Sequence, residues 1–229
     1  MPVFLATRVP GVRNRATVAF RIILIIPQVV VLFVVWIAAV VLGILGWFAA
    51  LFTGRLPDFA RTFLAGTVRW QTRVTAYLLL LTDEYPPFSL EVEERYPIQL
   101  AIPPVTPLNR FAVLGRIILV IPAAVVQGVL GTGAQLFSIA SWFAILFSGQ
   151  MPPSIFEAER AVLRYQARVY AYFWMLTPEY PAAVLGDATP PGTVDEAWLI
   201  RLSPQGRTAM TVLIVIGVIF TIFNYARVL

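Results

Sequence analysis

Two pairs of arginine residues are the groups in this sequence best suited to chemistry. Arg69 and Arg73 lie four residues apart, and Arg164 and Arg168 repeat this spacing further along. On an α-helix the spacing places both guanidinium groups on one face, where they can hold a phosphate or carboxylate through paired hydrogen bonds. In the alternative, structural role they reach the membrane surface or donate to backbone carbonyls of neighbouring helices. With the glutamine inside each pair, the candidate lipid- or anion-binding residues are Arg69, Gln71, Arg73, Arg164, Gln166 and Arg168.

A second motif follows each arginine pair. It reads TDEYP at residues 82–86 and TPEYP at residues 177–181. A docking or ion-coordinating site is one interpretation, but a proline replaces Asp83 in the second copy. We favour a helix boundary, at which the proline stops the helix, the tyrosine lies at the membrane interface and the glutamate faces water. The boundary residues are Thr82, Glu84, Tyr85, Thr177, Glu179 and Tyr180.

The composition predicts an integral membrane protein and excludes most catalytic chemistry. Of the 229 residues 59% are hydrophobic and only 13% charged, whereas soluble domains carry about 25% charge. All 17 basic residues are arginine, and without histidine or cysteine the usual general bases, thiolate nucleophiles and zinc or haem ligands are missing. There is also no phosphate-binding glycine loop and no GxSxG motif. We therefore expect no enzyme activity, no cofactor and no metal.

The chain is a tandem repeat. A shift of 95 residues aligns RIILIIP at 21–27 with RIILVIP at 116–122, and WFAALF at 47–52 with WFAILF at 142–147, without a gap. The predicted organisation is a first membrane repeat (1–95), a second membrane repeat (96–186), a polar linker (187–207) and a C-terminal transmembrane helix (208–227). Because the last helix has no counterpart in either repeat, we expect the repeats to fold without it.

The most distinctive segments resemble a known family. These are WFAALFTGRLP at 47–57, RWQTRVTAY at 69–77 and LLLLTDEYPPFSL at 78–90. They are similar to the bacterial family called domain of unknown function 4389, a set of uncharacterised membrane proteins. Both repeats carry the pattern, although the second departs from it at Pro178 and at 182–184. The resemblance implies a membrane location and supplies no catalytic residues.

Each repeat opens with an uncharged apolar run, at 22–52 and 117–147. A helix of this length measures about 46 Å, which exceeds a hydrocarbon core of roughly 30 Å. Pro27 and Pro122 are expected to break or kink the helix near its start. A hairpin within the run is the alternative, and glycines favour it only in the second repeat. We therefore predict one kinked spanning helix per run.

The second element of each repeat, 59–81 and 154–176, carries several arginines and either crosses the membrane or lies in its interface. Matching arginines in the two copies favour repeats that face the same way, which requires an even number of crossings, so we predict that this element crosses. Arginines are concentrated at the ends that would then face the cytoplasm, in accord with the positive-inside rule. In such parallel repeats, Glu84 and Glu179 are too far along the chain to reach either arginine pair, so the pairs lack an internal carboxylate.

Alternating apolar residues at 88–92, 98–102 and 2–7 predict short strands. The fold class is therefore an all-α integral membrane protein of two tandem parallel repeats of about 95 residues. Each repeat has a proline-kinked spanning helix and an arginine-bearing second helix, and the chain adds small cytoplasmic β-strands and one C-terminal spanning helix.

Three functional classes remain open. The first is a non-catalytic accessory or scaffolding subunit of a membrane complex, favoured by the small size and the missing catalytic groups. The alternative is a protein that binds or transports anionic lipid or small anions through the paired arginines, and a membrane enzyme ranks last. The net charge of +5 points to anionic lipid headgroups and not to nucleic acid. We expect a multi-pass protein of the bacterial plasma (inner) membrane with a cytoplasmic N-terminus and a protein partner.

Overall fold

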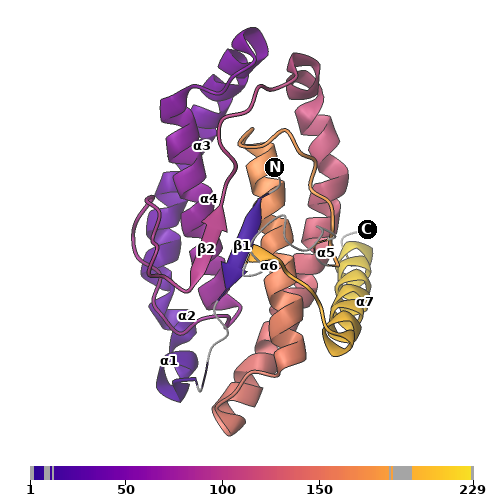
Figure 1. Cartoon of the computed structure of the whole chain (residues 1–229). Helices are drawn as coiled ribbons and strands as arrows, with labels where there is room; N and C mark the ends of the chain where they lie inside the picture. The colour runs from indigo at the N-terminus through magenta and orange to yellow at the C-terminus, as the bar shows by residue number, and fades with distance from the viewer. Residues whose placement is uncertain (1–2, 8–10, 12, 186, 188–197, 228–229) are drawn as a thin grey trace.

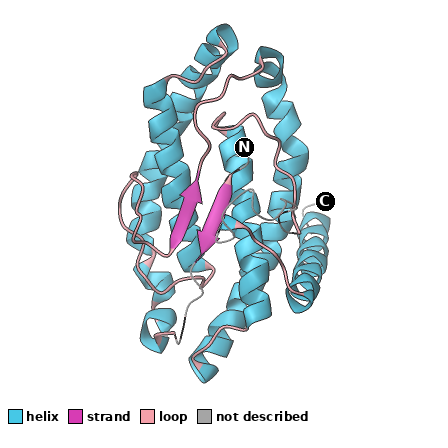
Figure 2. Cartoon of the chain, in the orientation of Figure 1, coloured by secondary structure: helices cyan, strands magenta, loops and turns pink. Residues whose placement is uncertain are grey.

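The computed structural model describes residues 3–7, 11, 13–185, 187 and 198–227. Helices dominate this part of the chain, with one two-stranded sheet (Figures 1 and 2). In chain order the elements are β1 (Phe4–Thr7), α1 (Arg15–Ala19), α2 (Arg21–Leu24), α3 (Ile26–Thr53), α4 (Asp58–Leu78), β2 (Ile98–Ala101), α5 (Arg110–Ser148), α6 (Pro153–Phe173) and α7 (Pro204–Ala226).

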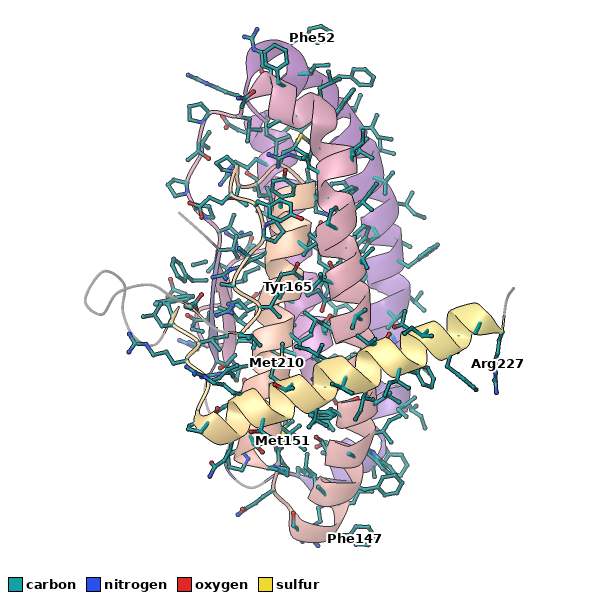
Figure 3. All side chains as sticks on the ribbon, turned by 90° about the vertical axis from the view of Figure 1, so that its right-hand side faces the viewer. Phe52, Phe147, Met151, Tyr165, Met210 and Arg227 are labelled. Atoms are coloured by element: carbon teal, nitrogen blue, oxygen red, sulfur yellow. The ribbon has the colours of Figure 1, made fainter. Side chains whose placement is uncertain are left out.

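The elements form three layers. The sheet packs on α4 and α6, and α3 and α5 pack on the opposite side of these two helices (Figures 1 and 3). Residues of α4 and α6 are buried on most of their faces because both sides are covered. By contrast, α3 and α5 expose a long series of valine, leucine, isoleucine and phenylalanine side chains.

Each apolar run is helical without a hairpin turn, so the hairpin alternative is wrong. The run of the second repeat is one helix, α5, and that of the first is the short α2 followed by the long α3. In the first repeat the helix is interrupted at Ile25. Pro27 therefore lies in the first turn of α3, where no backbone amide donor is needed. In the second repeat Pro122 lies inside the continuous α5. Both helices end at a glycine in the left-handed conformation, Gly54 (φ 73°) and Gly149 (φ 75°), a backbone geometry that other residues adopt only with strain.

The two repeats are antiparallel, and the predicted parallel arrangement is wrong. The amide of Leu108, before α5, donates to the carbonyl of Gly54 at the end of α3 (2.9 Å), and the amide of Arg13 donates to Gly149 in the same way (2.9 Å). The indoles of Trp47 and Trp142 make a second matched pair of bonds between the repeats. Each bond joins the end of one long helix to the start of the other, which requires opposite directions. The hydrogen bonds between the repeats therefore occur in matched pairs related by a pseudo-twofold axis. The similarity of the two copies in sequence does not reveal that they run in opposite directions.

The sheet lies on this pseudo-twofold axis. Strands β1 and β2 pair antiparallel, and Leu5 is opposite Leu100, its own equivalent 95 residues later. The strands predicted at 2–7 and 98–102 are thus confirmed as β1 and β2. The strand predicted at 88–92 is wrong, because this segment lies against α4, where a Cβ on Gly66 would be 2.5 Å from the carbonyl oxygen of Leu90.

Three helical segments in the described part of the chain are long and apolar enough to cross a membrane, at 21–53, 110–148 and 204–224. Helices α4 and α6 do not belong to this group. The predicted C-terminal helix is α7, which begins at Pro204, and most of the predicted linker at 187–207 lies outside the described residues.

Helix α7 packs against α5 and α6 of the second repeat, and the expectation that the repeats fold without it stays a prediction. Met210 and Leu213 are completely buried. A Cβ on Gly133 of α5 would lie 2.3 Å from the carbonyl oxygen of Leu213, and one on Gly217 would lie 2.2 Å from that of Val129. The two glycines allow the α5 and α7 backbones to meet directly, as small residues do between membrane helices.

This contact gives a test of the packing. We expect Gly133→Ala to lower the free energy of unfolding by about 1 to 3 kcal/mol, because the methyl group forces the two backbones apart. Chemical denaturation in mild detergent measures the change. Gly128→Ala is the matched control, since a Cβ there meets nothing within 4 Å and alanine favours the helix. Equal destabilisation of both variants would contradict the close packing of α7.

Candidate anion-binding site

In each repeat a buried arginine near the start of the apolar run forms hydrogen bonds with carbonyl oxygens at the carboxyl end of the second helix, α4 or α6. Arg21 donates to the carbonyl oxygens of Tyr77 (2.6 Å) and Thr82 (3.0 Å), and its guanidinium carbon lies 4.2 Å from the centre of the Tyr77 ring. The second repeat has the same arrangement around Arg116. A positive charge at the carboxyl end of α4 or α6 is favourable because carbonyls there lack helical partners. Sequence reasoning counted these arginines only as flanking charges.

The boundary motif lies just beyond the helix ends. Helices α4 and α6 end at Leu78 and Phe173, and the chain turns at Leu80 and Met175, both in the left-handed conformation (φ 60°). The threonine hydroxyl of each motif then accepts a hydrogen bond from the glutamate amide two residues on, and its tyrosine ring packs edge-on against a tyrosine of the helix. These contacts join Thr82 to Glu84, Thr177 to Glu179, Tyr85 to Tyr77 and Tyr180 to Tyr172.

The first repeat adds a carboxylate to its helix end. Asp83 pairs with Arg21 (2.8 Å) and lies 3.5 Å from Arg13. Burial lowers the pKa of Arg13 to about 10, although Asp83 opposes this effect, so the guanidinium is charged at neutral pH. The second repeat has Pro178 at the position of Asp83, and Arg116 relies on backbone carbonyls.

The arginine pair of the second repeat is neutralised by an acid from the linker. Arg164 and Arg168 reach the two oxygens of Asp187 at 2.5 and 2.7 Å, and the Ile200 amide donates to the same carboxylate (2.9 Å). Arg164 is completely buried and the Asp187 side chain is 3% exposed. The expectation that this pair lacks an internal carboxylate is therefore wrong. Glu84 and Glu179 are the acids that the repeat pattern brings into question, whereas the acid that binds the pair is Asp187, outside the repeated motifs.

The arginine pair of the first repeat forms no ion pair with an acid in the part of the chain that the structure describes, although Glu93 lies close enough to act on Arg73 through its charge. Arg73 donates to the carbonyl oxygens of Ser89 and Glu91. Arg69 makes no hydrogen bond or ion pair within the described residues, and its Nε is buried without an acceptor. The position equivalent to Asp187 is Val92, 95 residues earlier. The first repeat thus has the same cationic pair without the anion that balances it in the second.

A cavity of about 520 Å³ borders Arg69 and Arg73. Its walls come from α4, from the segment before β2, from β2 itself and from Trp198. The polar or charged side chains in the lining are those of Arg69, Thr72, Arg73, Glu93, Glu94 and Gln99. Two guanidinium groups and two carboxylates therefore share one pocket.

The glutamines predicted at the site lie elsewhere on their helices. Gln71 accepts a hydrogen bond from the indole of Trp36 on α3 (2.7 Å), which is on the side of α4 away from the sheet. Gln166 occupies the equivalent position of α6, two residues from each arginine, and residues at that spacing do not share a helical face.

Glu159 is a buried acid that sequence reasoning missed. Its side chain is fully buried in α6, and both oxygens lack a hydrogen-bond partner among the described residues. The first repeat has Leu64 at this position, and that substitution is the one signal in the sequence. No group of three or more histidine, cysteine or acidic residues suited to a metal occurs in the part of the chain that the structure describes.

The composition and fold define a membrane protein built from two copies of one helical repeat. Both copies match the model of the family described as Domain of unknown function (DUF4389), at residues 15–89 and 110–184, which together make up about two thirds of the chain. The protein belongs to this family, and the resemblance seen in the sequence is confirmed. No curated protein and no solved structure matches the chain.

The Asp187 cluster yields a prediction on stability and pH. Burial alone would raise the pKa of Asp187, but the Ile200 amide and the two guanidinium groups outweigh it, so the pKa lies below the ordinary 3.8. A carboxylate with a lowered pKa stabilises the fold above its ordinary pKa, and this contribution is lost as the pH falls through the lowered value. We expect Asp187→Asn to lower the free energy of unfolding at pH 7 by about 3 kcal/mol, because two buried arginines lose their counter-charge.

Denaturation in mild detergent between pH 7 and pH 3 measures both effects. The wild-type protein should lose stability at the acid end of this range, and the difference between it and Asp187→Asn should shrink there. Glu91→Gln, at an exposed acid, is the control and should behave as wild type. An Asp187→Asn protein as stable as wild type at pH 7 would contradict the cluster.

Proposed function

We propose that this protein is a non-catalytic, membrane-bound anion-binding protein, and that the pocket at Arg69 and Arg73 binds a carboxylate or a phosphodiester group. The observation that carries the proposal is the difference between the repeats. In the second repeat the carboxylate of Asp187 occupies the space between the two guanidinium groups. In the first, Val92 takes that position in the sequence, and a cavity adjoins the pair.

The chemistry of the lining supports a singly charged ligand. Arg73 is held in place by two backbone carbonyls, while the donors of Arg69 have no partner in the described structure. Arginine suits such a role because its planar guanidinium binds carboxylate and phosphate oxygens in pairs and stays charged. Glu93 and Glu94 lie in the same lining and repel any anion, a dianion more strongly than a monoanion. A ligand must therefore be held by direct hydrogen bonds from the guanidinium groups, and a carboxylate or a phosphodiester monoanion meets the least repulsion.

The repeat itself supplies the variant that tests the proposal. Val92→Asp places in the first repeat the acid that the second repeat has, and Val92 is 62% exposed, so the change leaves the core intact. We expect acetate or dimethyl phosphate to raise the melting temperature of the wild-type protein in detergent, because a ligand that binds only the folded state stabilises it. Val92→Asp should abolish this rise and weaken anion binding at least tenfold by calorimetry.

Val92→Asn is the matched control, because it has the same shape without the charge, and it should respond to both anions as wild type does. Vesicles of phosphatidylglycerol separate a lipid ligand from a soluble one. Binding of the vesicles but not of the free anions, lost in Val92→Asp, would identify the phosphodiester as a lipid headgroup. Val92→Asp that binds the anions as well as wild type would overturn the proposal.

The other expectations on function stay predictions. They are the accessory or scaffolding role with a protein partner, and the placement in the bacterial plasma membrane with a cytoplasmic N-terminus. An anion-binding protein is compatible with either.

A further inference from the structure

The lengths of α3 and α5 do not suit a perpendicular crossing. Helix α5 has 39 residues and extends about 58 Å, nearly twice the hydrocarbon thickness of roughly 30 Å. The uncharged run within it, at 117–147, alone exceeds that thickness. A helix that lies parallel to the membrane surface has no such limit on its length.

The charges at the middle of the bundle also disfavour a perpendicular crossing. The pseudo-twofold axis through Leu5 and Leu100 exchanges the two ends of the bundle, so the sheet lies halfway along the long helices (Figure 1). Glu91, Glu94 and Arg95 are exposed beside it. If α3 and α5 crossed the bilayer, these charges and the open edges of the sheet would lie at its centre, where charged groups and unpaired backbone groups are most unfavourable.

Helix α7 has the direction and length that α3 and α5 lack. It starts on the side of the sheet, passes α6 and α5, and projects beyond the layer of α3 and α5 (Figure 3). Its projecting half is apolar and exposed, at Val218, Ile219, Phe220, Ile222 and Phe223. Arg207 and Arg227 are 20 residues apart, about 30 Å along a helix, so each would reach one membrane surface.

We propose that α3 and α5 lie in the plane of the membrane, embedded among the acyl chains of one leaflet, and that α7 crosses the bilayer. The exposed apolar side chains of α3 and α5 then contact lipid along their whole length. A cavity of about 520 Å³ opens on this layer, lined by Arg116 and otherwise by apolar residues that include Trp36, Trp47 and Trp174, and it has room for part of an acyl chain. The layer of α4 and α6 lies at the level of the headgroups.

This orientation places the sheet and the Arg69 pocket on the aqueous side, because both are on the opposite side of α4 from α3. A ligand would therefore enter the pocket from water. The proposed orientation depends on the lengths of the helices, the positions of the charged residues and the order of the layers. Its test is independent of whether the pocket at Arg69 and Arg73 binds an anion.

Depth measurements with spin labels test the orientation, and the absence of native cysteine allows one label per variant. The α3 series consists of Ile23→Cys on α2, the short helix that precedes α3, and of Ile37→Cys and Phe52→Cys on α3 itself, all at exposed positions. On α7 they are Thr208→Cys, Val218→Cys and Ala226→Cys, also exposed. The labelled protein is reconstituted in vesicles of phosphatidylcholine and phosphatidylglycerol, and collision with oxygen and with a water-soluble nickel complex gives the depth of each label.

We expect the three α3 labels to lie at similar depth within the hydrocarbon, and the label at 218 to lie deeper than those at 208 and 226. A perpendicular bundle gives the opposite result, with position 37 deepest on α3 and a flat profile on α7. This perpendicular profile would overturn the proposal. Labels on α3 that all lie in water would also overturn it, and so would a depth profile on α7 without a maximum at 218. Variants at Ile118, Thr132 and Phe147 of α5, the equivalents of the three α3 positions, should repeat the α3 profile. A wild-type melting temperature for each labelled protein verifies folding.

Discussion

Guanidinium groups buried in an apolar chain need acceptors, and the structure is organised around supplying them. Arginine does not lose its proton in proteins, so each buried side chain must meet carbonyl oxygens or a carboxylate. Arg21 and Arg116 take carbonyls at the ends of α4 and α6. Other arginines form hydrogen bonds with the opposite repeat. Arg61 donates to the carbonyl of Leu176, and Arg168 donates to the carbonyl of Val3. The same bonds that satisfy the arginines therefore hold the two repeats together.

The repeats differ chiefly in where they place an acid. The first has Asp83 in an ion pair at its helix end, and no ion pair joins its arginine pair to an acid among the described residues, although Glu93 and Glu94 lie in the same pocket. The second has Asp187 bound to its pair and Pro178 at its helix end. This difference between the two arginine pairs is the observation on which the proposed anion-binding site rests. The buried carboxyl of Glu159, at the position of Leu64, is a further departure from symmetry.

The local structure could be predicted from the sequence, and the long-range relations could not. The prolines and the uncharged runs indicate helical runs without a hairpin through local geometry. Period-two alternation indicates β1 and β2, but the same pattern at 88–92 forms no strand because that segment packs on α4. The relative direction of the repeats depends on contacts such as Trp47 with Val113 and Trp142 with Val18, which join residues that no local pattern connects. The role of Asp187 could not be predicted for a similar reason, because its contacts with Arg164, Arg168 and Ile200 join residues that no local pattern connects. The arginine pairs were found because a helical spacing of four is itself a local property.

The central claim is that the two repeats run in opposite directions, and one distance tests it directly. Phe52 and Phe147 are equivalent positions near the ends of α3 and α5, both exposed, and they lie at opposite ends of the molecule (Figure 3). Spin labels on the double variant Phe52→Cys and Phe147→Cys, measured by pulsed dipolar spectroscopy in detergent and in vesicles, give their separation. Antiparallel repeats predict a distance on the order of 50 Å, close to the length of α5. Neighbouring parallel helices would bring the two labels within about 25 Å of each other, and that distance would contradict the account.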